Sequence, residues 1–226
     1  MSVREEFDAW AAAGRDRGME RRHWHTAKEI LSRMPLENGD TVLDLGCGSG
    51  YAARALREAG GAGRAYGVDG SPAMVENASS YTNDDRIGYL VGDFEHLPFA
   101  ADSVDHCFSM EAFYYARSPE ATLQELDRVI RSGGTFYCGV NYYEENVHSH
   151  SWGSDMELEL TRWDAERYRR AFREAGFHVA EQDNIPDRKT EIPPEEEFPT
   201  ENWERREEMV ERYREYGTLL TVGVVP

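Results

Sequence analysis

A glycine-rich turn at residues 42–50, "VLDLGCGSG", constrains the fold more than any other stretch of this chain. A strand-forming run leads directly into Gly46, Gly48 and Gly50, and a helix-forming segment starts near Tyr51. Glycines there let a strand turn tightly into a helix and let backbone amides approach a ligand. The pattern predicts a nucleotide-like ligand at the carboxyl end of a β-strand.

Two carboxylates indicate which nucleotide it is. Gly48-x-Gly50-x-x-Ala53 also fits a dinucleotide-binding turn. Asp44, just before the loop, would repel a pyrophosphate but attract the α-ammonium group of an amino acid. Asp69 ends the next strand candidate, 19 residues beyond Gly50, where a carboxylate accepts both hydroxyls of a ribose. An amino acid joined to a nucleoside is S-adenosyl-L-methionine, which we therefore favour over a dinucleotide.

Hydrophobic runs alternate with helical patterns along most of the chain, which predicts an α/β fold with a parallel sheet. The first five strand candidates are residues 41–46, 64–70, 86–93, 103–110 and 134–141. Ser71-Pro72 and Ser118-Pro119 each open a helix, and we expect Gly133-Gly134 to end the second one. A helix over 163–175 opened by Thr161-x-x-Asp164, a strand near 177–182, an acidic insert and a strand over 217–225 complete the order.

Length and cysteine usage bound the class of protein. A chain of 226 residues fits one domain with a single large core. It has no apolar run long enough for a membrane span and no signal-peptide pattern. The three cysteines, Cys47, Cys107 and Cys138, are scattered and suggest neither a zinc site nor a disulfide framework. We expect a cytoplasmic protein with no membrane partner.

The formal net charge of -18 argues against direct binding of nucleic acid, because phosphate binding needs basic patches. Of the 25 basic residues, however, only Lys28 and Lys189 are lysines. This skew toward arginine, together with surplus Asp and Glu, resembles proteins adapted to high salt, where an acidic surface stays hydrated. A halophilic habitat therefore explains the negative charge at least as well as the absence of a nucleic-acid ligand does.

Three motifs carry a resemblance to the class I S-adenosylmethionine-dependent methyltransferases, specifically the ubiquinone/menaquinone-biosynthesis-like subgroup. They are "LDLGCGSG", "YGVDGSPAMV" and "GDFEHLPFAADSVD", in the family's order within residues 38–141. The resemblance implies a Rossmann-like seven-stranded sheet, mostly parallel, in the order 3-2-1-4-5-7-6, with the last strand antiparallel and helices on both faces. It also implies S-adenosyl-L-methionine as cofactor and S-adenosyl-L-homocysteine as product.

The same motifs imply which residues bind the cofactor. Asp69 would hold the ribose, Asp93 the adenine amino group, and the Phe94 amide would meet the ring. Met74 would line the adenosine, although a methionine on an apolar helix face also fits the core. The full expected set is Asp44, Gly46, Cys47, Gly48, Ser49, Gly50, Asp69, Gly70, Ser71, Met74, Gly92, Asp93, Phe94, Ser109, Met110 and Glu111.

We expect one methyltransferase domain over residues 1–226 with four parts. They are an N-terminal helical cap (1–37), the cofactor-binding core (38–141), an acceptor-side loop (142–162) and an acidic helical insert before the last strand (185–216). Helices before the first strand commonly cover the cofactor in this family, which draws attention to Arg22, His23 and Trp24.

The segment "SMEAFYYA" (109–116) follows the fourth strand, beside the transferable methyl group in this fold. Enzymes that methylate amino groups of nucleobases typically carry Asn/Asp-Pro-Pro-aromatic there, and this chain does not. Not all of Phe113, Tyr114 and Tyr115 can face the ligand, so at least one belongs to the core. The catalytic residue is unknown, and the candidates are Glu111, Tyr114, Tyr115, His23 and Asn141.

A dedicated base is optional, because positioning alone accelerates methyl transfer strongly. His148-x-His150 lacks a third ligand at local spacing, so we expect no metal. We favour methylation of a small-molecule acceptor, and two alternatives stay open: translation-linked methylation of RNA or protein, and cofactor binding without catalysis. In the first alternative, a small zinc-binding activator protein would pair with the edge strand at 86–91, and nucleic acid would be reached only indirectly.

Overall fold

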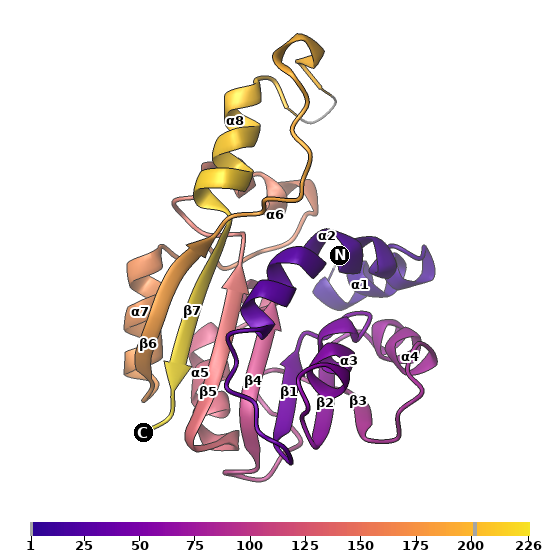
Figure 1. Ribbon diagram of the computed structural model, residues 1–226, viewed down its shortest axis with the longest axis vertical. Coiled ribbons are helices and arrows are strands. Elements are labelled where there is room, and N and C mark those ends of the chain that lie inside the picture. The colour runs from indigo at the N-terminus through magenta and orange to yellow at the C-terminus, as the bar shows by residue number, and fades with distance from the viewer. Residues whose placement is uncertain (1, 201–202) are drawn as a thin grey trace.

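The computed structural model describes residues 2–200 and 203–226 (Figure 1). The strands are β1 (Thr41–Leu45), β2 (Arg64–Asp69), β3 (Ile87–Val91), β4 (Val104–Met110), β5 (Ile130–Val140), β6 (His178–Ile185) and β7 (Thr218–Val224). The α-helices are α1 (Val3–Ala12), α2 (Asp16–Leu31), α3 (Tyr51–Glu58), α4 (Pro72–Ser80), α5 (Pro119–Val129), α6 (Trp152–Asp155), α7 (Ala165–Glu174) and α8 (Arg206–Val210). Short 3₁₀ turns are η1 (Phe113–Tyr115), η2 (Val147–Ser149) and η3 (Glu195–Glu197), and η4 (Glu211–Tyr216) is a π-helical turn.

The strands form one seven-stranded sheet in the order β3-β2-β1-β4-β5-β7-β6. Neighbours from β3 to β5 pair in parallel, and β7 is antiparallel to both β5 and β6. The predicted strand order and the antiparallel last strand are confirmed. β3 is one edge of the sheet, and its outward side pairs with no other described strand.

Helices cover both faces because both faces of the central strands are apolar. Val42 and Leu43 are consecutive in β1 and belong to opposite cores, as side chains alternate along a strand. One core packs α5 and α7 on the sheet, with the Phe136 and Phe172 rings stacked at 5.4 Å. The other packs α2 and α3. Truncating a fully buried Phe or Leu in either core would cost about 2–5 kcal/mol.

Two expected helix boundaries are wrong. Helix α5 ends at Val129 and the chain enters β5 at once, because Ile130 already has extended dihedral angles (φ -81°, ψ 130°). Gly133 and Gly134 therefore lie inside β5, where a Cβ on Gly134 would come within 2.4 Å of the Asp105 carbonyl oxygen. Helix α7 is capped by Asp164, whose side chain accepts from the Arg167 amide, and Thr161 takes no part in the cap.

The carboxyl ends of the parallel strands are flanked by two additions to the sheet (Figure 1). Helix α1 packs on α4, and α2 runs past α3 toward β4 and β5. The segment between Ile185 and Thr218 leaves the sheet with η3, α8 and η4 and projects from the same end as α6. Both additions therefore border the space where a ligand of this fold binds.

No helix in the described part of the chain is long and apolar enough to cross a membrane.

Candidate functional site

A cavity of about 920 Å³ lies between the carboxyl ends of the strands and the N-terminal helices. Residues expected to bind cofactor line much of it: Gly46, Cys47, Gly48, Ser49, Asp69, Gly70, Ser71, Gly92, Asp93, Phe94, Met110 and Glu111. Besides Glu111, two more catalytic candidates, His23 and Tyr115, line it as well. The structure thus gathers residues from three separate sequence motifs and from the cap around one space.

The glycine loop leaves room for a ligand at one position and for protein at the other two. Gly46, Gly48 and Gly50 all have positive φ, between 49° and 76°, a conformation that other residues rarely adopt. A Cβ on Gly46 would lie 2.1 Å from the Cβ of Ala112, and one on Gly50 would lie 2.4 Å from the Tyr89 hydroxyl. Gly48 has no atom within 4 Å of such a Cβ. The open side of the loop therefore fits a ligand that packs against backbone.

Asp69 closes the loop from the end of β2. Its two carboxylate oxygens accept from the Gly48 amide and the Ser71 amide, both at 2.9 Å. Burial raises the pKa of Asp69, and these two amide hydrogen bonds oppose the rise. Ser71 in turn caps α4 by accepting from the Met74 amide at 3.1 Å. The carboxylate expected to hold a ribose is thus fixed by two motifs at once.

Asp44 does not line the cavity. Its buried carboxylate accepts at 3.0 Å from the amide of Ala53, in the first turn of α3. The cap residue of that helix, Gly50, has no side chain to bind this amide, so Asp44 supplies the acceptor from β1. Burial raises the pKa of Asp44 to about 7. Its position does not support the expected attraction of an ammonium group.

Five other expected site residues also lie outside the cavity lining: Gly50, Met74, Ser109, Tyr114 and Asn141. Met74 is fully buried in α4, as the core alternative requires. The hydroxyl of Ser109 donates to the Leu45 carbonyl oxygen at 2.9 Å and joins β4 to β1. All five residues are buried, so they support the wall of the cavity without contacting its interior.

Glu111 forms the wall beyond β4 and has a positive φ of 57°. Its carboxylate accepts from the Asn141 amide, and from the Tyr114 hydroxyl at 3.2 Å. Burial raises the pKa of Glu111 to about 7, against the opposing effects of the Arg212 charge and these hydrogen bonds. A carboxyl group with this pKa exchanges its proton near neutral pH, which suits an acid or a base. Tyr114 and Asn141 thus contact the candidate base without lining the cavity themselves.

The three rings of "SMEAFYYA" divide between core and cavity. Phe113 packs on Phe136 with ring centroids 6.0 Å apart, and Tyr114 is buried over Tyr142 at 5.4 Å. Of the three, Tyr115 lines the cavity, where its ring meets Phe7 of the cap edge-on at 5.0 Å. Two rings are therefore structural.

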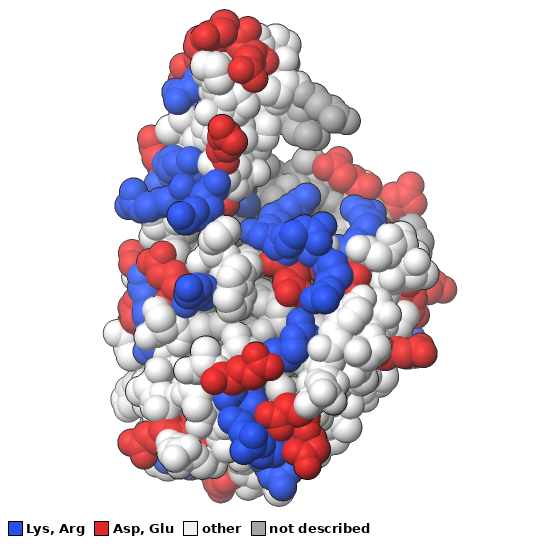
Figure 2. Space-filling model, turned by 45° about the vertical axis from the view of Figure 1, so that its right-hand side comes forward, with Lys and Arg blue, Asp and Glu red and all other residues white. Residues whose placement is uncertain are grey.

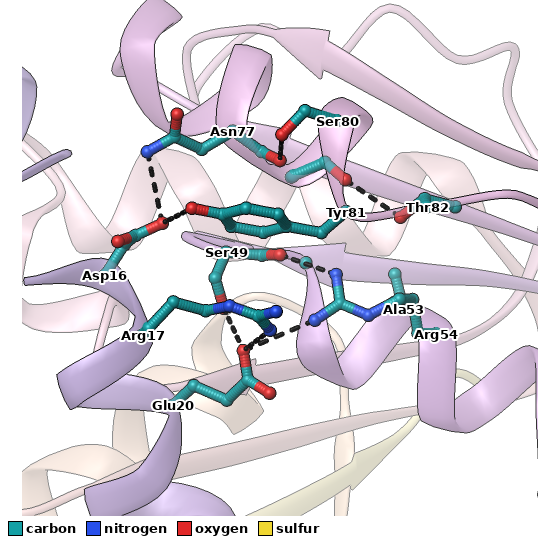
Figure 3. Close-up of polar contacts among 12 residues, drawn as sticks. Asp16, Arg17, Glu20, Ser49, Ala53, Arg54, Asn77, Ser80, Tyr81 and Thr82 are labelled. Carbon is teal, nitrogen blue, oxygen red and sulfur yellow. Dashed lines mark hydrogen bonds and ion pairs between the residues drawn. The ribbon is translucent and has the colours of Figure 1, made fainter. Parts of the chain in front are cut away.

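The cap binds the cofactor loops through carboxylates that the sequence motifs did not indicate. Asp8 of α1 accepts from the Ser71 hydroxyl at 2.5 Å. Glu20 of α2 accepts from the Ser49 hydroxyl at 3.0 Å and from Arg54 at 3.3 Å (Figure 3). Asp16, in the same view, accepts from Asn77 at 3.1 Å and Tyr81 at 3.0 Å. The cap is thus held on both sides of the glycine loop.

Further lining residues were missed as well. Helix α1 and its N-cap residue contribute Ser2, Val3, Arg4 and Phe7. The acceptor-side loop contributes Glu157, Leu158 and Glu159. Arg117 also lines the cavity and forms an ion pair with Asp93, the acid expected to bind adenine. The sequence offers a weak signal for the cap in the Ser2-x-x-Glu5 capping box. The others carry no motif.

His148 and His150 bond neighbouring groups of the protein, and the three cysteines are buried. His148 bonds Glu211 at 3.0 Å, and His150 bonds the Glu144 carbonyl oxygen at 2.9 Å. No three His, Cys, Asp or Glu side chains in this part come together as a metal site requires. All three cysteines are buried and free, and burial raises the pKa of the Cys47 thiol, so a reactive thiolate is disfavoured.

Comparison with known proteins identifies the family. The family model described as "Methyltransferase domain" matches residues 43–138. A chain in the complex between the Haloferax volcanii Trm112 methyltransferase activator and a methyltransferase is 65% identical, with a TM-score of 0.97 and complete coverage of both chains.

Curated relatives are more distant. The sterol 24-C-methyltransferase of Pneumocystis carinii is 32% identical over 57% of this chain and 35% of its own length. The malonyl-[acyl-carrier protein] O-methyltransferase of Pectobacterium atrosepticum is 39% identical over 48% of this chain and 42% of its own. The chain spans less than half the length of these relatives. From the fold, the cavity and the full-length match, the chain belongs to the class I S-adenosylmethionine-dependent methyltransferases, and its cofactor is S-adenosyl-L-methionine.

Proposed function

We propose that this chain is the catalytic subunit of a methyltransferase whose edge strand β3 is completed by a small zinc-binding activator protein. The observation that carries the proposal is the exposed apolar surface of that strand. Leu90 and Val91 are 37% and 51% exposed, and both lie in β3. An edge strand with exposed large apolar side chains is a site for strand addition or aggregation.

The backbone of β3 supports the same proposal. The Ala65 amide donates to the Arg86 carbonyl oxygen, and the Gly92 amide donates to the Asp69 carbonyl oxygen. Because backbone groups of a strand alternate in direction, Gly88 and Leu90 also face β2. Ile87, Tyr89 and Val91 then direct their backbone groups outward. The Ile87 amide already donates to the Asp84 carbonyl oxygen, so Tyr89 and Val91 offer the amide and carbonyl groups for an added strand. The 65% identical methyltransferase assembled with Trm112 is a precedent for such a partner.

Within the cavity, we propose that the cofactor packs against the open backbone surface of the glycine loop at Gly48 and is held by the Asp69 carboxylate, with Asp93 and the Phe94 amide at its adenine. S-adenosyl-L-methionine supplies a methyl group already activated by its positively charged sulfur. The residues of the chain then position the acceptor and exclude water, which accounts for much of such a rate enhancement. Glu111 would accept a proton from an acceptor that must lose one, with Asn141 and Tyr114 orienting its carboxylate.

Origin and acceptor also belong to this proposal. The motif pattern supports the ubiquinone/menaquinone-biosynthesis-like subgroup, and the net charge of -18 supports a halophilic cell. Three free cysteines support a reducing cytoplasm. A cavity enclosed by the cap favours a small molecule, or a small group presented by a larger one, over a nucleobase amino group.

Pairing through β3 is tested by co-expressing the chain with a Trm112-type partner. We expect a stoichiometric complex by size-exclusion chromatography, with one zinc per complex. Leu90→Lys should weaken the complex at least about tenfold, because it places a charge in an apolar contact. Val147→Lys is the matched control, since Val147 is another exposed apolar residue, at 53%, outside β3. Equal loss in both variants, or no complex with the wild type, would contradict the proposal.

A further inference from the structure

The cavity needs an acceptor for the amino-acid end of the cofactor. Asp44 is the partner that the sequence predicts for the α-ammonium group, but its carboxylate lies outside the cavity lining and accepts from the Ala53 amide. An ammonium group carries a positive charge and three N–H donors. Burying such a group without a partner is costly, so another acceptor in the lining is required.

The order of the strands indicates where this end of the cofactor lies. The neighbouring strands β3, β2, β1 and β4 lead, at their carboxyl ends, to Asp93, Asp69, the glycine loop and Glu111, which all border the cavity. With the adenine at Asp93 and the ribose at Asp69, the remainder of the molecule continues along this row. Its amino-acid end then lies over the glycine loop, and its methyl group lies toward Glu111.

Helix α2 of the cap turns one side toward this part of the cavity. Four of its residues line the cavity at helical spacing: Asp16, Met19, Glu20 and His23. Contacts fix the position of this row of side chains. Asp16 accepts from Asn77 of α4, and Glu20, about one turn further along α2, accepts from the Ser49 hydroxyl. Glu20 is therefore a carboxylate of the cap that lies at the glycine loop.

Glu20 is held through one carboxylate oxygen, which leaves the other oxygen free. Its Oε2 accepts from the Ser49 hydroxyl and from Arg17, both at 3.0 Å, and from Arg54 at 3.3 Å (Figure 3). Its Oε1 accepts from no group in the described part of the chain and is not a buried atom. The side chain as a whole is 24% exposed. A carboxylate anchored in this way offers an accessible oxygen at a fixed position.

The charges of α2 are distributed unevenly around the helix. Its exposed Lys and Arg residues are Arg17, Arg21, Arg22 and Lys28. Figure 2 shows Lys and Arg side chains gathered across the middle of the molecule, beneath the projecting insert, at the height of α2 in Figure 1. Of the acids of α2, Glu29 is exposed, whereas Asp16 and Glu20 line the cavity. The cavity side of this helix is thus its acidic side, which favours a cationic group there.

We infer that Glu20 binds the α-ammonium group of S-adenosyl-L-methionine through Oε1, in the role that the sequence predicts for Asp44. A hydrogen bond between an ammonium group and a carboxylate is charge-assisted and stronger than a neutral one. The cap then contributes to recognition of the cofactor as well as covering it. This inference rests on the proposed function, because it takes the positions of the adenine and the ribose from it.

The test pairs one change in the protein with one change in the ligand, as in a double-mutant cycle. The ligands are S-adenosyl-L-homocysteine and its deamino analogue, in which a hydrogen atom replaces the α-amino group. The full-length wild type and Glu20→Gln are titrated with each ligand by calorimetry, at one pH and one salt concentration. We expect the wild type to bind S-adenosyl-L-homocysteine at least about tenfold more tightly than the analogue. Glu20→Gln should lose most of this preference.

Two controls separate recognition of the ammonium group from a change in the cap. Glu29→Gln is the matched variant, because Glu29 lies on the same helix, pairs with Arg33 and does not line the cavity; it should keep the wild-type preference. The second control is 5′-methylthioadenosine, which lacks the whole amino-acid end and should bind Glu20→Gln as tightly as the wild type.

The outcomes distinguish a failure of this inference from a failure of the cofactor site. The same preference in Glu20→Gln and in the wild type would overturn the inference alone. Weaker binding of 5′-methylthioadenosine by Glu20→Gln would also overturn it, because Glu20 would then act through the structure of the cap. If the wild type bound none of the three ligands, the proposed cofactor site would fail, and this inference with it.

Discussion

Replacing Glu111 by glutamine should change how the stability of this protein depends on pH. Glu111 is 9% exposed, and the pKa of its carboxyl group rises from an ordinary 4.5 to about 7 because burial disfavours the charged form. Glutamine has nearly the same shape and still accepts from the Asn141 amide through its carbonyl oxygen. The Tyr114 hydroxyl can accept from the new amide instead of donating. The variant therefore removes the titration and little else.

The sign follows from proton linkage. A carboxyl group with a higher pKa in the folded state binds its proton more tightly there, so its contribution to stability is complete below pH 4.5 and is lost as pH rises through 7. A shift of this size corresponds to about 3 kcal/mol, at 1.36 kcal/mol per pKa unit. The wild type should lose this amount between those two pH values relative to Glu111→Gln.

Urea unfolding of both proteins at fixed salt, at intervals from pH 4.5 to 8, measures the effect. The difference between the two free energies of unfolding is the informative quantity, because other groups titrate in the same range. His23, with a pKa near 4, stabilises the protein as pH rises, and Asp44, with a pKa near 7, does the opposite. Both contributions cancel in the difference. Parallel curves for the two proteins would refute the assignment of a buried, titrating carboxyl group.

Three other predictions concern the cofactor loop and the surface. Asp69→Ala should weaken S-adenosyl-L-methionine binding about 100-fold by calorimetry, since it removes the ribose acceptor and two amide contacts; unchanged affinity would exclude Asp69 from the site. Gly46→Ala should lower the free energy of unfolding in urea by at least about 2 kcal/mol more than Gly61→Ala does. Both glycines have positive φ, but a Cβ would meet a neighbour, Ala112, only at Gly46. Equal losses would contradict the close approach of Ala112. Raising KCl from about 0.2 to about 2 M should raise Tm by screening repulsion among the surplus acids, and a fall in Tm would argue against a halophilic adaptation.

The sequence predicted those parts of the site that are local. Gly46, Gly48 and Asp69 act through the backbone geometry of one turn and one strand end, which short motifs encode. The strand order was confirmed for a similar reason, because each motif has a fixed place in the family's topology. The ends of α5 and α7 were missed by a few residues, since capping depends on dihedral angles that spacing does not fix.

Side-chain direction and long-range contacts were not predictable in this way. Asp44 belongs to a recognised motif, yet its carboxylate turns toward the start of α3, where an amide lacks an acceptor. Asp8 contacts Ser71 across 63 positions of the chain, and no spacing rule relates them. Arg212 lies in an insert that resembles a solvated acidic excursion in sequence. Only the folded chain brings its guanidinium over the ring of Trp152.

The hydrogen bonds between the cap and the cofactor loops have a kinetic consequence. Asp8 and Glu20 hold helices α1 and α2 against Ser71 and Ser49, which border the space assigned to the cofactor. Product has to leave, and fresh cofactor has to enter, past a segment held by these contacts. Whenever they break more slowly than a methyl group is transferred, the residence time of the product determines the turnover number, and the identity of the acceptor has no influence on it.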